Sequence, residues 1–171
     1  MSDQPVEICE YDPAWPERFA EQRGVVERIL EPWLAAPVEH VGSTSVPDLP
    51  AKPVVDMLAG VRDLEESRPC IDLLSADGWL WAPYREDVEH WFCRPSVEHR
   101  THHLHVVEHG GELWNDMLAF RDALRADDDL RDRYAALKRD LAAQHRDDRN
   151  AYTDAKSTFV AAALATARQG R

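Results

Sequence analysis

The stretch from Val38 to Val61, VEHVGSTSVPDLPAKPVVDMLAGV, constrains the fold more than any other part of the chain. Two β-branched runs, Val38–Val41 and Val54–Val61, predict two strands joined by a loop rich in hydroxyl and proline residues. The second run carries Asp56 among apolar neighbours. A carboxylate is seldom fully buried unless it is paired or binds a metal. We therefore expect Asp56 to lie in a functional cleft rather than at a plain strand edge.

Length and charge limit the classes of protein that this chain can belong to. A length of 171 residues indicates one domain over the whole chain, and a domain of this size buries roughly 70% of the surface of its unfolded chain. The net charge of −12 argues against a broad surface for a nucleic-acid polymer. The sequence has no apolar run of the ~18 residues that a membrane span needs, and three cysteines without metal or redox spacing indicate reduced thiols. We expect a cytoplasmic protein that contacts neither membrane nor polynucleotide.

The remaining patterns divide the chain into a strand-rich first half and a helical second half. After Gly110, three apolar stripes at helical spacing predict three helices, separated at Asp127–Asp129 and Asp147–Asp148, whose carboxylates suit helix N-caps. This order indicates an α+β fold, a mixed sheet flanked by helices. The first half is expected to hold a strand at Val6–Cys9, a helix capped by Asp12 and opened by Pro13, a helix at Leu64–Ala76 with Ile71, Leu73 and Leu74 facing inward, a hairpin of Trp79–Ala82 with Val88–Arg94, and a strand at Thr101–Val107.

A run of histidines, His102-His103-Leu104-His105, falls on the last of these strands. Side chains alternate along a strand, so His103 and His105 share one face and lie about 7 Å apart. Two such imidazoles can converge on a metal, a phosphate or a carboxylate. Surface histidines on an edge strand are the alternative interpretation. A cupin-type metal site would add Glu108, but the three long C-terminal helices argue against that barrel.

The loop Gly42-Ser43-Thr44-Ser45 is a candidate anion site. A glycine after a strand permits a sharp turn, and the hydroxyls and backbone N–H groups that follow can surround an anion. Lys52 can supply the countercharge. Three prolines in the loop exclude the helix that a Walker-type phosphate loop requires. Ordinary turn chemistry is the alternative here.

Together, Gly42-Ser43 at the end of one strand and Asp56 in the next resemble the signature of the DNA polymerase beta-like nucleotidyltransferase superfamily. In that superfamily the Gly-Ser pair holds the triphosphate of a nucleotide, and carboxylates on the strand hold Mg²⁺, which prefers oxygen ligands. The superfamily pattern continues with an apolar residue and a second Asp or Glu. Here the trio is Asp56-Met57-Leu58, so half of the carboxylate pair used in two-metal catalysis is missing.

At closer range, the chain resembles the GrpB family. This resemblance implies a nucleotidyltransferase-like fold, a small mixed sheet flanked by helices with a helical C-terminal half. It also implies that some members are fused to dephospho-coenzyme A kinase, but it does not imply a particular reaction. One departure is Asp48, where a glycine commonly follows Val-Pro in the family. The matching segments run through nearly the whole chain: Glu39–Pro47, Ala51–Asp56, Arg100, His102–Val106, Phe120–Asp122 with Leu124, Tyr134, Leu137–Lys138, Tyr152–Thr153, Lys156 and Phe159.

With such a fold, Asp56, His103 and His105 would lie near the Gly42–Ser43 turn, and the histidines would replace the missing carboxylate. Because imidazole is a softer ligand than a carboxylate oxygen, this set would favour Mn²⁺, Fe²⁺, Ni²⁺ or Zn²⁺ over Mg²⁺. Glu39 and His40 point to opposite faces of their strand, so only one of them can face the cleft. Tyr134 and Tyr152 are candidates to stack on a base, with core packing as the alternative. The basic residues at family-pattern positions would form a phosphate or carboxylate pocket: Lys52, Arg100, Arg121, Lys138 and Lys156.

The leading hypothesis from these residues is a metal-dependent transferase that acts on a nucleotide or similar phosphorylated molecule and a small-molecule acceptor. Residues 42–45 would position the phosphates, Lys52 and Arg121 would neutralise charge, and Asp56 with the two histidines would bind metal or act as acid and base. A second hypothesis is a noncatalytic module, or a degenerate transferase, that binds a nucleotide or a coenzyme A precursor. A third is histidine–metal chemistry on a small acid.

Overall fold

The computed structural model describes residues 5–169, and its centre is a mixed sheet of five strands. The strands are β1 (Glu39–Val41), β2 (Val55–Val61), β3 (Leu80–Ala82), β4 (Glu89–Pro95) and β5 (Arg100–Glu108). Their order in the sheet is β1-β2-β5-β4-β3. β2 and β5 run parallel, and the other neighbouring pairs are antiparallel. The predicted mixed sheet flanked by helices is therefore confirmed.

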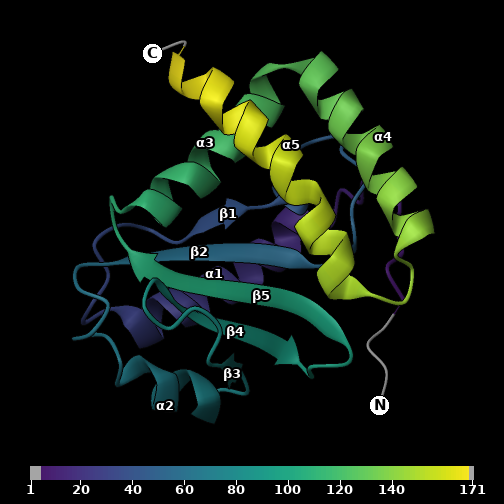
Figure 1. Cartoon of the computed structure of the whole chain (residues 1–171). Helices are drawn as coiled ribbons and strands as arrows, with labels where there is room; N and C mark the ends of the chain where they lie inside the picture. Colours follow the sequence, from purple (N-terminus) through teal and green to yellow (C-terminus); the bar gives the residue numbers. More distant parts are fainter. Residues whose placement is uncertain (1–4, 170–171) are drawn as a thin grey trace.

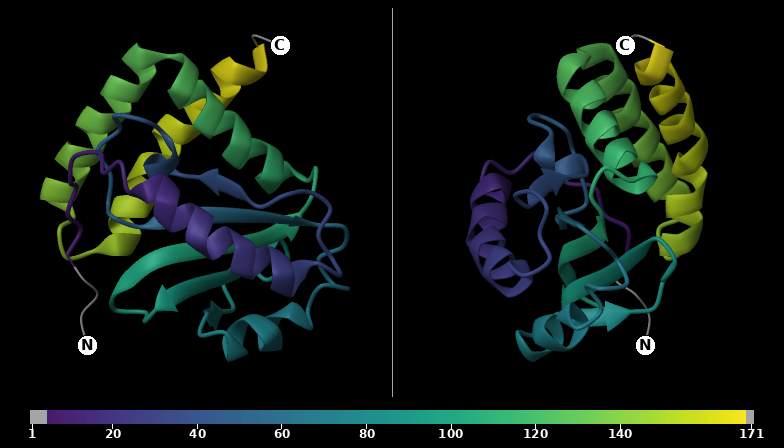
Figure 2. Two further views of the ribbon diagram at one scale, coloured as in Figure 1. Left: turned by 180° about the vertical axis from the view of Figure 1, so that it is seen from behind. Right: turned by 90° about the vertical axis from the view of Figure 1, so that its left-hand side faces the viewer.

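Helices cover both faces of this sheet. One face packs against α1 (Trp15–Leu30), and the other carries α3 (Glu112–Ala126), α4 (Asp128–Gln144) and α5 (Arg149–Gln169). Figure 2 shows the sheet between α1 and the three C-terminal helices in its right-hand view. The short α2 (Cys70–Ala76) lies near β3. No helix within residues 5–169 has the length and apolar character needed to cross a membrane.

Strand alternation decides which side chains of β2 meet which helices. Met57 is buried in the core that includes Trp15 of α1, whereas Leu58 is buried with Trp114 of α3. Since successive side chains of a strand point to opposite faces, Asp56 lies on the same face as Leu58. Asp56 therefore points toward the C-terminal helices.

Two of the predicted helix caps are present. The Oδ1 atom of Asp127 accepts a hydrogen bond of 2.9 Å from the backbone N–H of Leu130 at the start of α4. Asp148 accepts one of 2.9 Å from Ala151 at the start of α5. Each side chain satisfies a backbone donor that has no partner within the helix, which is why acidic residues mark these breaks.

Four local predictions were wrong. Residues 6–9 form no strand, and only Cys9 makes an isolated bridge, with Ala51. The first helix begins at Trp15, because Asp12 caps a turn by accepting the N–H of Ala14. The second begins only at Cys70, and residues 64–69 form turns. Pro69 explains the later start, since the residue before a proline avoids the helical conformation. Helix α2 leaves Leu73 49% exposed, although we predicted that it faces inward.

Candidate functional site

A pocket of about 650 Å³ lies on the sheet face that the C-terminal helices cover. Its walls come from the loop between β1 and β2, from strands β2, β3, β4 and β5, and from helices α4 and α5. The structure therefore brings together residues that are distant in sequence. The predicted site residues that line it are Ser43, Lys52, Asp56, Arg100, His103, His105, Lys138, Tyr152 and Lys156.

Asp56, His103 and His105 form a connected polar chain in this pocket. The parallel register of β2 and β5 places Asp56 opposite His103 and Leu58 opposite His105. The Nδ1–H of His103 donates to Asp56 Oδ1 at 3.0 Å, and His105 Nε2 lies 3.9 Å from the same oxygen. On its other side, His105 Nδ1 donates to Glu89 Oε2 at 2.7 Å. His105 is thus held between two carboxylates.

The partners of these side chains set their charges. Burial acts to raise the pKa of Asp56, but its hydrogen bond with His103 and its ion pair with His105 hold the pKa well below its usual range. Burial would lower the pKa of His105, yet Asp56 and Glu89 together raise it to about 9. For His103, burial outweighs the hydrogen bond with Asp56 and lowers the pKa from 6.5. At neutral pH, Asp56 is therefore ionised, His105 protonated and His103 neutral.

One ring nitrogen of the neutral His103 is free to accept a proton. Its Nδ1 carries the proton that Asp56 accepts, so the lone pair lies on Nε2. Within the described part of the chain, this buried Nε2 has no hydrogen-bond partner. An orphaned buried nitrogen beside a pocket is a candidate proton acceptor.

The predicted metal ligands are hydrogen-bonded to one another and to Glu89 in this structure. Among residues 5–169, no three His, Cys, Asp or Glu side chains are placed so that they could hold a metal ion. Both Nδ1 atoms donate to carboxylates, so a metal at this site would have to displace a proton from His105. The divalent metal at Asp56, His103 and His105 stays a prediction.

Lysines supply the positive charge of the pocket. Of the 20 Lys and Arg residues in this sequence, only three are lysines, and all three, Lys52, Lys138 and Lys156, line the pocket. Lys138 is 2% exposed, and its ammonium group donates to Ser43 Oγ at 2.9 Å and to the carbonyl of Pro50. Three ammonium groups gathered in a protein of net charge −12 favour an anionic ligand. Lysine usage is a sequence signal that could have ranked these residues above the arginines.

The pocket depresses the basicity of these lysines. Burial is the main cause in each case, and for Lys52 and Lys138 the neighbouring cations add to it. The pKa of Lys138 falls to about 7, and those of Lys52 and Lys156 fall to about 8. A bound anion would stabilise the charged forms and raise these pKa values again.

We expect Lys138→Met to change how stability depends on pH. Between the folded pKa of about 7 and the ordinary value of 10.5, the unfolded chain binds a proton at this amine and the folded chain does not. Stability of the wild type therefore rises with pH in this window. With ~1.4 kcal/mol per pKa unit, the free energy of unfolding should rise from pH 7 to pH 9 by about 2 kcal/mol more in the wild type than in Lys138→Met. Urea denaturation at both pH values measures this.

Arg133→Met, at an exposed position of the same helix, is the matched control and should show the pH dependence of the wild type. If Lys138→Met also shows it, the depressed pKa of Lys138 is contradicted.

Four predicted site residues do not line the pocket, and three of them build the turn beside it. Gly42 has a φ of 70°, and a Cβ there would lie 2.3 Å from Asp56 Oδ2. Thr44 Oγ1 is hydrogen-bonded to His40 Nε2 at 2.9 Å, and Ser45 Oγ donates to the carbonyl of Gly42 at 2.6 Å. Of the loop hydroxyls, only Ser43 therefore faces the pocket.

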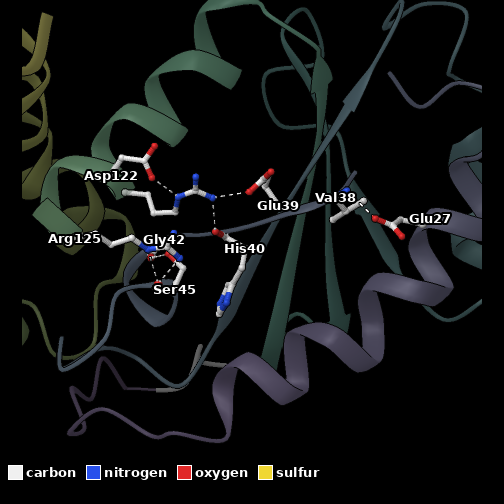
Figure 3. Close-up of polar contacts among 9 residues, drawn as sticks. Glu27, Val38, Glu39, His40, Gly42, Ser45, Asp122 and Arg125 are labelled. Atoms are coloured by element: carbon white, nitrogen blue, oxygen red, sulfur yellow. Dashed lines mark hydrogen bonds and ion pairs between the residues drawn. The ribbon is translucent and has the colours of Figure 1, made fainter. Parts of the chain in front are cut away.

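Arg121, on α3, is the fourth, and its side chain contacts β1 instead of lining the predicted anion pocket. Its Nη1 donates to Glu39 Oε2 at 2.7 Å and to the carbonyl of His40 at 3.1 Å. Figure 3 shows these contacts, with Arg125 donating to the carbonyl of Ser45. The ring of His40 stacks on Phe19 of α1, with the ring centroids 4.7 Å apart. Glu39 thus points to the face of the C-terminal helices, and neither it nor His40 lines the pocket.

Sequence reasoning missed several residues that line or support the pocket. Glu89 is buried behind His105. The sequence signal that could have found it is the same as for Asp56, a carboxylate inside an apolar strand. Trp91 and Tyr84 form part of one wall, and Arg149 and Asn150 at the start of α5 form part of another. These four carry no sequence signal of their own, because only the pairing of β4 with β5 and the position of α5 bring them to the pocket.

Comparison with known proteins identifies the family. A family model described as "GrpB protein" matches residues 5–166. This chain belongs to the GrpB family. It is 34% identical over 164 residues to UPF0157 protein YqkA of Bacillus subtilis, covering 96% of this chain and 48% of that protein. It is 39% identical over 165 residues to UPF0157 protein SCO7215 of Streptomyces coelicolor, covering 96% of this chain and 85% of that protein.

Structural comparison agrees with this assignment. The crystal structure of conserved protein GrpB from Enterococcus faecalis superposes with a TM-score of 0.86 at 30% identity, covering 96% of this chain and 98% of that one. A more distant relative, named dephospho-CoA kinase, from Mycolicibacterium paratuberculosis is 28% identical over 182 residues. This chain spans 44% of that relative's length and about half of YqkA.

The backbone at Asp48 is in a conformation that suits glycine. This residue has a φ of 63°, in the left-handed region where glycine has no steric cost. Asp tolerates that region better than most side chains. The aspartate therefore occupies a turn position whose backbone conformation suits a glycine, as expected from the family resemblance.

Proposed function

We propose that the pocket binds the phosphates of a nucleoside triphosphate or a similar phosphorylated small molecule, and that the protein transfers part of it to a small-molecule acceptor. The observation that carries this proposal is the convergence of all three lysines beside Ser43 and the Asp56–His103 pair. Lysine provides a compact point charge for phosphate oxygens, and the acidic exterior disfavours a polynucleotide ligand.

The lysines would stabilise charge on the leaving group. In such a transfer, an acceptor oxygen attacks phosphorus while the bond to the departing pyrophosphate breaks, and negative charge develops on the pyrophosphate. Fixed cations placed where that charge develops lower the barrier. The ammonium groups of Lys52 and Lys156 both lie over the ring of Tyr152, 5.1 and 4.4 Å from its centroid. This contact would keep the two ammonium groups in position to bind the phosphates.

The Asp56–His103 pair would handle the proton. His103 Nε2 would accept the proton of the attacking hydroxyl group, while Asp56 holds the ring in the tautomer that leaves Nε2 free. Glu89 and Asp56 would keep His105 protonated next to the reacting phosphate. This scheme requires no metal. The divalent ion inferred from Asp56, His103 and His105 is therefore tested as a separate condition.

A noncatalytic module that binds a nucleotide or coenzyme A precursor is the second candidate. Leu58 supports it, because this fully buried side chain stands where the nucleotidyltransferase pattern has a second carboxylate. The relative named dephospho-CoA kinase supports coenzyme A precursors as the ligands. In this case the same pocket would bind without turnover.

Thermal shift with sodium tripolyphosphate, ATP and dephospho-coenzyme A, each with and without Mg²⁺ or Mn²⁺, tests the proposal. We expect the polyphosphates to raise the melting temperature, and ATP with an acceptor to release pyrophosphate. Lys156→Ala should weaken tripolyphosphate binding about tenfold, since a hydrogen bond to a charged group contributes ~1.5–3 kcal/mol. Arg168→Ala, at an exposed position of the same helix, should not.

The outcomes separate the candidates. ATP binding without pyrophosphate release in any metal condition favours the noncatalytic module. Stabilisation by metal alone, with no response to any phosphate, favours histidine–metal chemistry on a small acid. Failure of every polyphosphate to bind overturns the proposed function.

A further inference from the structure

The pocket has one wall without charged side chains, made by Ala82, Tyr84 and Trp91. Ala82 and Trp91 are direct partners in the β3–β4 register, so they share a face of the sheet. Tyr84 follows at the end of β3, where its backbone N–H donates to the carbonyl of Ala82 at 2.8 Å. The side chain of Tyr84 is 61% exposed, although it is aromatic. A large aromatic side chain left open beside a cationic pocket calls for a ligand group that covers it.

Trp91 connects this wall to the polar residues of the pocket. Its ring centroid lies 5.0 Å from that of His103, and the Arg100 guanidinium lies 5.4 Å from the Trp91 ring. A flat group against this wall would therefore lie near both the proposed proton acceptor and the lysines that line the same pocket.

The tyrosines first considered for stacking are not available to a ligand ring. Tyr134 is 4% exposed and stacks on Phe159, with the ring centroids 5.2 Å apart. Tyr152 is 1% exposed, whereas Trp91 is only half-buried. Tyr134 and Tyr152 belong to the frame of the pocket, and this leaves Trp91 and Tyr84.

We propose that Trp91 and Tyr84 form a subsite for a planar aromatic ring of nucleobase size, carried by the ligand whose phosphates the lysines hold. This inference rests on the proposed function. The pocket volume of about 650 Å³ is typical of sites for ligands with an organic portion, which occupy about 300–1,000 Å³. Stacking on a Trp or Tyr ring is tolerant of ring identity, because every base presents a π-face.

Isothermal titration calorimetry with three probes tests the subsite: ATP, sodium tripolyphosphate and adenosine. We expect ATP to bind the wild type about tenfold more tightly than tripolyphosphate, in line with measured base–aromatic stacking. Trp91→Leu should abolish this advantage and leave the affinity for tripolyphosphate within about twofold of the wild type. Trp91→Phe, which keeps an aromatic face, should retain most of it.

Tyr84→Ala tests the subsite with a variant that should still fold, because a side chain that is 61% exposed contributes little to the stability of the fold. It should lower the affinity for ATP and not that for tripolyphosphate, whereas Leu73→Ala, at an exposed position outside the pocket lining, should change neither. Equal wild-type affinities for ATP and tripolyphosphate would overturn the subsite, as would a Trp91→Phe variant as weak as Trp91→Leu. Adenosine binding without tripolyphosphate binding would support the subsite and overturn the proposed function. Binding of none of the probes would overturn both.

Discussion

Gly42→Ala is expected to lower the free energy of unfolding by about 3 kcal/mol or more and to disrupt the site. Gly42 has a φ of 70° and a ψ of −175°, a region that only glycine occupies without strain. The added methyl group would also lie 2.3 Å from Asp56 Oδ2. Because Asp56 is held by His103 and His105, it cannot move away without breaking the polar chain. Urea denaturation measures the loss of stability, and tripolyphosphate titration measures the loss of the site.

Gly24→Ala is the matched control. Gly24 lies inside α1, and a Cβ there would meet only the end of Arg28, at 3.7 Å. Alanine favours a helix interior over glycine by ~0.5–1 kcal/mol, so this variant should be more stable than the wild type. A Gly42→Ala protein as stable as the wild type would show that the turn can relax, contrary to the role we give it.

The floor of the site could be predicted from the sequence because strand geometry is simple. The two-residue period of a strand places His103 and His105 on one face and Leu104 on the other, and the structure has this arrangement. The position of Asp56 followed from the cost of burying an unpaired carboxylate. Both inferences depend on one strand at a time, and neither needs knowledge of how the strands pair.

The helical wall could not be predicted in the same way. The helical pattern alone gave Arg121 and Lys138 equal signals, since each is a basic residue within an amphipathic helix. The packing of the helices decides what each residue contacts: α3 brings Arg121 to Glu39 on β1, and α4 brings Lys138 to Ser43. A helix presents its side chains around a full circle, so small differences in its rotation decide which residue reaches a pocket.

Residues that only strand pairing brings to the site, such as Glu89 and Trp91, could not be predicted from the sequence either. Glu89 reaches His105 because β4 runs antiparallel to β5 in a register that pairs Trp91 with His105. A shift of one residue would turn Glu89 and Trp91 to the opposite face of the sheet. That register depends on contacts between β4 and β5 that the pattern of either strand does not fix.

Asp56→Asn should abolish transfer while preserving anion binding. The amide has no negative charge to hold the His103 tautomer or to balance protonated His105, so pyrophosphate release should fall by about 10²-fold or more.

The affinity of Asp56→Asn for tripolyphosphate should stay equal or increase, because a carboxylate that repels phosphate is gone. The pKa of His105 should fall from its value of about 9, which NMR titration of the imidazole measures. Loss of a buried ion-pair partner should also destabilise the fold by ~3 kcal/mol at pH 7.

The pH dependence of stability gives a second, independent check of Asp56. Its folded pKa lies below the ordinary value of 3.8, so the stability it contributes is present above that value and is lost as the pH falls through the acid range. The wild type should therefore lose more stability than Asp56→Asn between pH 5 and pH 2. Asp72→Asn, at an exposed position on α2, should follow the wild type in stability and in pyrophosphate release. An Asp56→Asn protein that still releases pyrophosphate at the wild-type rate would remove Asp56 from the chemistry and leave the lysines with a binding role alone.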